Sequence, residues 1–240
     1  MTKESYFKLY PRAVCFFCIA LLCAIVGLSN VLMQCHQQPP SMVLLSAVCA
    51  FHMVTATLSV AQCLALAILS FAVLVGDEKS TGSLYFNALI PTAFATSLFA
   101  LVSGAFFGRS AFGEYWLWDF HLTWLLVQCG SLFLGLALRV DAGFGPTRTN
   151  NVRSALFILL GFIVLALSYM YFNFFEQIYG QFMNFVLGNT WLGIWVQIGI
   201  FFMAGLFYCL CTICSRARTI ILECNTDSVW ARDGALFGEL

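Results

Sequence analysis

The sequence predicts an all-α membrane protein, a bundle of six transmembrane helices with both termini on the cytoplasmic or matrix side. Three observations lead to this fold class. Hydrophobic residues make up 61% of the chain and charged residues only 9%, whereas about 25% of the residues of a soluble domain are charged. The apolar residues lie in six long stretches. Nearly all lysines and arginines lie before the first stretch, after the second, after the fourth and after the sixth. Because so few polar side chains are available to cover a globule, lipid must surround most of the chain.

Each expected helix is an apolar stretch of sufficient length, since roughly 20 apolar residues are needed to span about 30 Å of hydrocarbon. The expected spans cover residues of about 13–33, 50–75, 85–107, 122–139, 153–172 and 189–213. The second apolar run starts near Met42 and is too long for one upright span. Residues 42–50 are therefore expected to lie on the membrane surface or to extend the helix. The longest polar pieces are 141–151 and 215–240, so residues 1–240 are expected to form one domain.

The basic residues predict the orientation of the spans. If six spans alternate, ten of the eleven lysines and arginines fall on one side of the membrane, and only Arg109 lies on the other. The positive-inside rule assigns the basic side to the cytoplasm or matrix. Both termini are therefore expected on that side, and the connection after the third span is expected on the outer side.

This outer connection is rich in aromatic and polar residues. It carries Trp116 and Trp118, with Trp124 close behind, although the whole chain has only six tryptophans. Asp119 and His121 lie in the same segment. Tryptophan is common at the headgroup level of any membrane protein, so an ordinary aromatic belt is one interpretation. The alternative is a flat aromatic wall against which a planar, amphiphilic ligand packs.

The order of these residues resembles a known signature. The pattern Gly-x-x-Trp-x-Trp-Asp-x-x-Leu-Thr is carried here by Gly113, Trp116, Trp118, Asp119, Leu122 and Thr123. It is similar to the tryptophan-rich signature of the haem-delivery protein C family of cytochrome c maturation, and the preceding Leu-Val-Ser-Gly at 101–104 fits the same family. The resemblance implies non-covalent binding of haem b and its presentation at the outer face for cytochrome c assembly. The implied partners are an ABC-type membrane complex and a membrane-anchored haem chaperone.

His52 is the candidate axial ligand and therefore the candidate metal-binding residue. An imidazole at the outer end of the second span is costly unless its nitrogens find partners, which makes it a functional candidate. A structural histidine bonded to a carbonyl or to water would meet the same requirement. The resemblance favours the ligand, because the family has an iron-binding histidine at the matching place.

The second axial ligand departs from the resembled family, which has another histidine at the outer end of its fifth span. Matching the aromatic pair that follows puts Tyr169 at this position, and the chain has only three histidines. Tyrosine can ligate ferric haem and the adjacent Met170 could ligate ferrous haem. His36, in another outer loop, is a further possibility, and so is the loss of haem.

Two residues near the tryptophans are candidate contacts for the haem propionates. Arg109 is always charged and can bind a carboxylate through two bonds, although an arginine without a ligand would also suit this interface. His121 replaces an arginine of the family and should capture anions more weakly, because it is largely neutral near pH 7. Tyr115 is expected to extend the aromatic wall. Asp119 is expected to cap the fourth span and to orient the tryptophans.

Composition argues against several other functions. The net charge is zero, whereas binding to nucleic acid requires a basic face. The sequence has no visible nucleophile–base pair or phosphate-binding loop, so no enzymatic activity is expected.

A haem-free structural subunit of a larger inner-membrane respiratory complex, derived from the same family, is the main alternative function. The 25 phenylalanines and 11 cysteines favour the mitochondrial inner membrane over a bacterial inner membrane.

Overall fold

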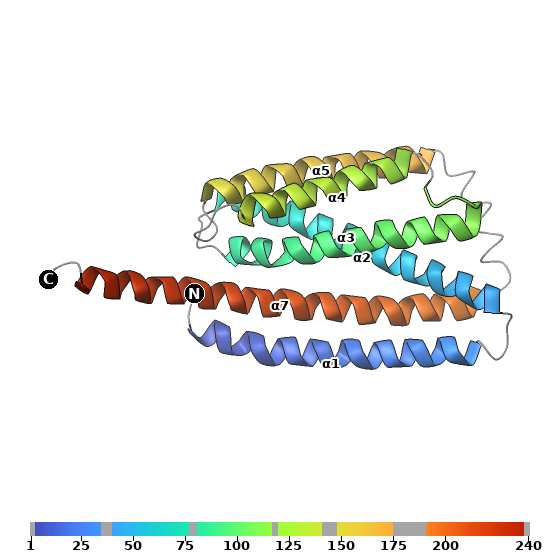
Figure 1. The fold of residues 1–240 in the computed structure, drawn as a ribbon, viewed down its shortest axis with the longest axis horizontal. Coiled ribbons are helices and arrows are strands. Elements are labelled where there is room, and N and C mark those ends of the chain that lie inside the picture. Colours follow the sequence, from blue (N-terminus) through green and yellow to red (C-terminus); the bar gives the residue numbers. More distant parts are fainter. Residues whose placement is uncertain are drawn as a thin grey trace.

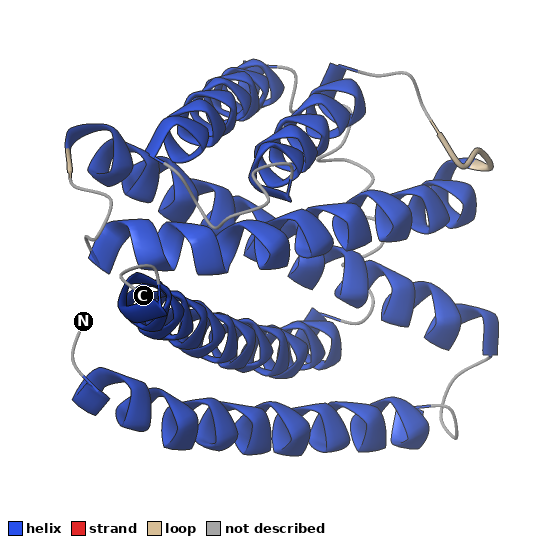
Figure 2. Ribbon diagram, turned by 60° about the vertical axis from the view of Figure 1, so that its left-hand side comes forward, coloured by secondary structure: helices blue, strands red, loops and turns tan. Residues whose placement is uncertain are grey.

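The computed structural model of the 240-residue chain describes residues 3–34, 40–76, 81–116, 120–140, 148–174 and 191–237. Within these residues all regular structure is helical (Figures 1 and 2), which confirms the predicted all-α class. The helices are α1 (Lys3–Gln34), α2 (Pro40–Val75), α3 (Thr81–Phe112), α4 (Phe120–Val140), α5 (Arg148–Phe174) and α7 (Trp191–Phe237).

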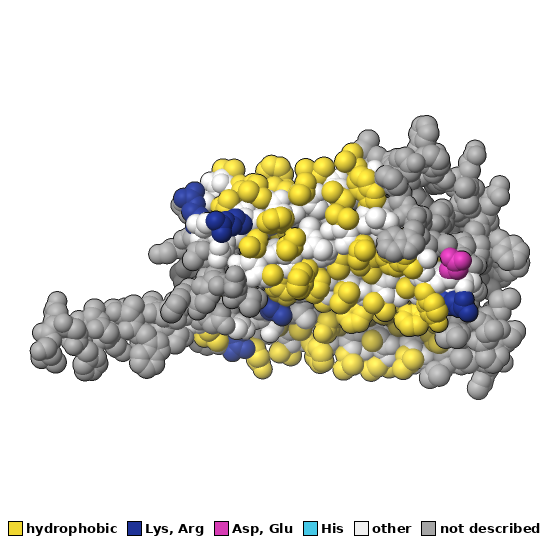
Figure 3. All heavy atoms as spheres, turned by 45° about the horizontal axis from the view of Figure 1, so that its top comes forward, with side chains coloured by type: hydrophobic (Ala, Val, Ile, Leu, Met, Phe, Trp, Pro, Cys, Tyr) yellow, Lys and Arg dark blue, Asp and Glu magenta, His cyan; other side chains and the backbone are white. Residues whose placement is uncertain are grey.

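Five of these helices are long and apolar enough to cross a membrane. Their apolar segments are Lys8–Val31, Ala47–Val75, Thr81–Ser110, Arg148–Leu167 and Ile198–Leu222. The fourth expected span, 122–139, corresponds to α4, whose apolar segment Leu122–Leu138 is shorter than the other five. Figure 3 shows the apolar side chains as a broad band, with basic side chains near one end and charged side chains of both signs near the other.

Most helices extend beyond the expected spans, as α1 does by starting at Lys3, and two of these extensions are informative. In α2 the helix begins at Pro40, so residues 42–50 extend the helix and do not form a separate surface element; proline suits the first position of a helix. At the other end of the chain α7 continues to Phe237, well beyond the expected limit at 213. The first part of the extension has a physical cause, because Ala217 and Ile221 are buried against Leu9 of α1 and Leu84 of α3.

The helices pack as three neighbouring pairs: α1 with α7, α2 with α3, and α4 with α5. Figures 1 and 2 show α2 and α3 in the middle, between the α1–α7 pair and the α4–α5 pair. The largest core cluster joins α2, α3, α4 and α5 through Leu66, Phe86, Ile90, Leu132 and Ile158, all fully buried. The middle pair therefore forms a rigid base for any site at its ends.

Polar contacts lie inside this core as well. The side-chain amide of Gln128 in α4 donates to Sγ of Cys63 in α2 at 3.1 Å, and Gln62 in α2 donates to Sγ of Cys209 in α7 at 2.9 Å. Hydrogen bonds of this kind hold membrane helices together, where the hydrophobic effect cannot. They satisfy the amide nitrogens of these glutamines inside such an apolar chain.

Candidate functional site

His52 lies in α2 and faces α3, the helix that leads into the aromatic segment. Its Nδ1 is 3.3 Å from Oγ of Ser103. Its ring stacks on Phe107, with the centroids 5.8 Å apart and the planes 11° from parallel. The side chain of His52 is half-buried. The last turns of α3 therefore fix both the position and the tilt of the imidazole.

Gly104 makes the close approach of His52 to α3 possible. A Cβ atom added at Gly104 would lie 3.0 Å from Cε1 and 3.4 Å from Nδ1 of His52. Ser103 and Phe107 stand four positions apart and share one side of the helix with Gly104 between them. From the sequence, Ser103 and Gly104 were expected only to be part of the family resemblance, and their contact with the imidazole was not predicted. The available signal was a hydroxyl and a glycine side by side in an apolar span.

A second hydroxyl supports this contact. Oγ1 of Thr55 is 3.1 Å from Oγ of Ser103, and both side chains are buried. Backbone carbonyls are alternative acceptors for the two hydroxyl protons, since Thr55 also reaches those of Phe51 and His52, and Ser103 reaches that of Ala100. The oxygen of Ser103 then has a lone pair for the imidazole. In the tautomer with the proton on Nδ1, His52 donates to Ser103 and Nε2 is the basic nitrogen.

The end of α3 carries the predicted cation. The chain leaves the helix at Gly113, whose φ of +83° is typical of a glycine that ends a helix. The Gly113 amide donates to the carbonyl of Arg109 at 3.2 Å, and the Arg109 guanidinium donates back to the Gly113 carbonyl. The same guanidinium lies over the ring of Tyr115, 5.4 Å from its centroid. Arg109 therefore fixes the path of the chain as it enters the tryptophan segment.

Aromatic contacts connect His52 with this segment. Phe106 meets Tyr115 edge to face, with centroids 6.2 Å apart and planes at 82°, while its neighbour Phe107 stacks on His52. Tyr115 is 57% exposed, and Trp116 is half-buried. The imidazole and the start of the predicted aromatic wall thus lie at the same end of α3.

Other predicted site residues are described less completely. Trp118, Asp119 and His36 lie outside the described residues. His121 lies in the first turn of α4 and Tyr169 near the end of α5, but the structure describes only their backbone. Figure 1 shows the end of α5 at the same end of the bundle as the end of α3, so the backbone of residue 169 is at the expected end.

Comparisons with known proteins identify the family of the chain. The model of the family described as "CcmC: Heme exporter protein C" matches residues 3–232. The chain is also similar to the "Cytochrome c biogenesis protein CcsA" of Oenothera argillicola and of Oenothera biennis, with 29% identity over 87 residues. That segment is 36% of this chain but only 26% of each relative, so the chain matches about a quarter of their length. Because the family model covers nearly the whole sequence, the chain belongs to the heme exporter protein C family.

Proposed function

We propose that this protein binds haem non-covalently and presents it, as cargo, at the outer face of an inner membrane for cytochrome c assembly. Membership of the heme exporter protein C family and the similarity to cytochrome c biogenesis proteins support a role in haem handling. The observation that carries the proposal is the oriented imidazole of His52 beside Phe107, at the end of α3 that holds Arg109 and Tyr115. The role is one of binding and delivery without catalysis.

The residues at this end fit a haem. A haem site needs an axial donor, flat apolar walls and cations for the propionates. His52 offers the donor, and Tyr115 and Trp116 offer aromatic faces. Arg109 has five N–H groups, enough to bind the Gly113 carbonyl and still reach a propionate. When bound, the haem itself supplies the iron; the protein contributes ligation, stacking and charge.

The orientation of the spans is part of the proposal. We infer six spans, with α4 as the shortest, and both termini in the cytoplasm or matrix, because basic residues then gather on that side. The site at the end of α3 would face the periplasm or the intermembrane space. We favour the mitochondrial inner membrane, with an ABC-type complex and a membrane-anchored haem chaperone as partners. The axial ligand opposite His52 would come from Tyr169 or its neighbour Met170.

Ser103 is proposed as a positioning residue for His52. Replacing it with alanine removes the hydroxyl at Nδ1, and loss of such a partner typically weakens metal binding about 10–100-fold. We expect Ser103→Ala to weaken haem binding by this amount and to raise the midpoint potential of the bound haem, because the imidazole becomes a weaker donor. A haem titration and a redox titration measure the two effects.

Ser97→Ala is the matched control, since Ser97 is equally buried on α3 but bonds to Ser59 at 2.7 Å. It should change neither the affinity nor the potential. Equal effects of the two substitutions would refute a specific role for Ser103.

The competing function is that of a haem-free structural subunit in a respiratory complex. Tyrosine at 169 and histidine at 121, where the resembled family has histidine and arginine, favour it. Purification from haem-replete cells without added haem separates the two functions. The proposal expects a Soret band and about one haem per chain. A colourless protein that co-purifies in fixed ratio with a respiratory complex would establish the structural role.

A further inference from the structure

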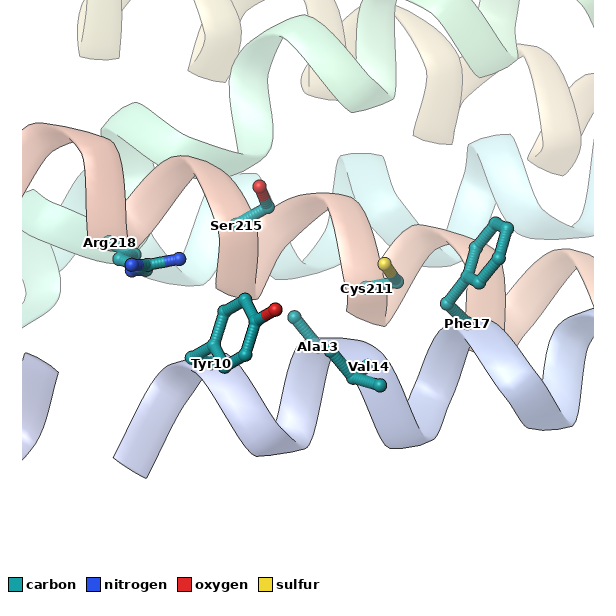
Figure 4. Close-up of a pocket in the computed structure, with 7 residues that line it drawn as sticks. All are labelled: Tyr10, Ala13, Val14, Phe17, Cys211, Ser215 and Arg218. Carbon is teal, nitrogen blue, oxygen red and sulfur yellow. The ribbon is translucent and has the colours of Figure 1, made fainter. Parts of the chain in front are cut away.

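A groove runs along the surface between the packed helices α1 and α7, at the end of the bundle opposite His52. It has a volume of about 240 Å³. The walls come from both helices, and Figure 4 shows its lining side chains, among them Tyr10, Ala13, Val14, Phe17, Cys211 and Arg218. Two helices that run in opposite directions thus form one elongated depression on the surface.

The groove changes in polarity along its length. Tyr10 and Arg218 lie within a few residues of the ends of the apolar segments Lys8–Val31 and Ile198–Leu222, at the level of the membrane interface. Phe17 is two turns deeper, which is about 10 Å at 1.5 Å per residue. Figure 4 shows Arg218 toward one end of the groove and Phe17 toward the other. The groove therefore has a polar mouth and an apolar interior.

Arg218 is held at this mouth. Its guanidinium lies over the ring of Tyr10, 4.7 Å from the centroid, a cation–π arrangement that positions the charge beside the groove. The side chain of Arg218 is half-buried, whereas that of Arg216 is exposed. The planar fork of an arginine matches the geometry of a phosphate.

Charge within the two apolar segments has one sign, while the acidic residues Glu4 and Glu223 lie just outside them. The two apolar segments carry four basic residues, Lys8, Arg12, Arg216 and Arg218, and no aspartate or glutamate. The groove also opens toward lipid. Val14 and Phe17 are 45% and 49% exposed, and among the described helices α1 packs chiefly against α7. An occupant would need an anionic head at the interface and an apolar chain in the hydrocarbon.

We propose that this groove binds an anionic phospholipid, with its phosphate at Arg218 and an acyl chain along Val14 and Phe17. Basic pockets between transmembrane helices bind anionic headgroups in this way. A free phosphate would leave the apolar wall unused, and a zwitterionic lipid would gain little from the surplus of basic charge. The lipid would bridge α1 and α7 and so stabilise their pairing. The site is independent of haem.

The test uses the purified full-length chain in detergent. The protein is titrated with long-chain phosphatidylglycerol, long-chain phosphatidylcholine or inorganic phosphate. Native mass spectrometry measures binding, and thermal unfolding measures Tm. Phosphatidylglycerol is expected to bind and raise Tm, and the other two are expected to have little effect. Arg218→Gln should weaken phosphatidylglycerol binding about five-fold, as expected for the loss of one basic contact. Arg216→Gln, with the same charge loss on the same helix but outside the groove lining, should bind like the unchanged protein.

A second variant tests the apolar part of the groove without altering charge. Val14→Trp should fill the groove and reduce phosphatidylglycerol binding, and because Val14 is exposed the fold should persist. An equal loss of phosphatidylglycerol binding in Arg216→Gln and Arg218→Gln would overturn the proposal, since it would indicate that the lipid is attracted diffusely to basic charge. Binding of inorganic phosphate as strong as that of the lipid, or no effect of Val14→Trp, would overturn it as well.

Discussion

Substitution of His52 by alanine is expected to remove most of the haem from the purified protein. The substitution deletes the imidazole that Ser103 and Phe107 orient, and the aromatic faces and Arg109 cannot replace a bond to iron. Because loss of a supporting partner alone costs about 10–100-fold in metal affinity, loss of the ligand itself should cost at least as much. The measurement is Soret absorbance per chain, compared between proteins purified in the same way.

A rescue experiment separates ligation from a purely structural role of His52. In His52→Gly, added imidazole should enter the space left by the side chain and restore the Soret band. A structural histidine predicts a protein of lower stability with unchanged colour. Full haem content in His52→Ala would remove His52 from the site.

Substitution of Gly161 is expected to produce the largest loss of stability. A Cβ atom at this position in α5 would lie 1.9 Å from Oγ of Ser131 and 2.7 Å from Oε1 of Gln128, both in α4. The two helices must separate to admit it, which disturbs the contact of Gln128 with Cys63 in α2. We expect Gly161→Ala to cost about 1–3 kcal/mol, the usual range for overpacking, and Gly161→Leu to cost more. Unfolding in mixed micelles measures the difference.

Gly130 provides the control for this substitution. It lies in α4, and an added Cβ would meet nothing within 4 Å. Gly130→Ala should be neutral or slightly stabilising, because alanine favours a helix by about 1 kcal/mol over glycine. Similar destabilisation at positions 130 and 161 would show that close packing of α4 on α5 is not the cause.

The general architecture could be predicted from composition because lipid imposes strict requirements on length and polarity. The apolar stretches therefore predicted where the helices lie, and the basic residues at their ends predicted how the spans are oriented in the membrane. The extent of α7 could not be predicted in this way. Residues 214–237 look polar on average. The helix continues as far as Ile221 because Ala217 and Ile221 pack against α1 and α3, which no local pattern indicates.

The candidate site also has features that could be predicted from the sequence and features that could not. Arg109 and Tyr115 could be selected from residue type and position, whereas His52 and Gly113 depended largely on the family resemblance. The partners of His52 could not be predicted, because Ser103 lies 51 residues away in the sequence and its relation to the imidazole depends on how α2 packs on α3. Gly104 matters for the same reason: its lack of a side chain has meaning only once the imidazole is known to face it.

The central claim is that one haem lies between the imidazole of residue 52 and the aromatic segment that follows α3. Structure determination of the haem-loaded protein by electron cryomicroscopy tests it most directly. The account predicts density that joins iron to Nε2 of His52, with the porphyrin against Tyr115 and Trp116. A macrocycle bound elsewhere, or an imidazole that makes no contact with iron, would contradict it.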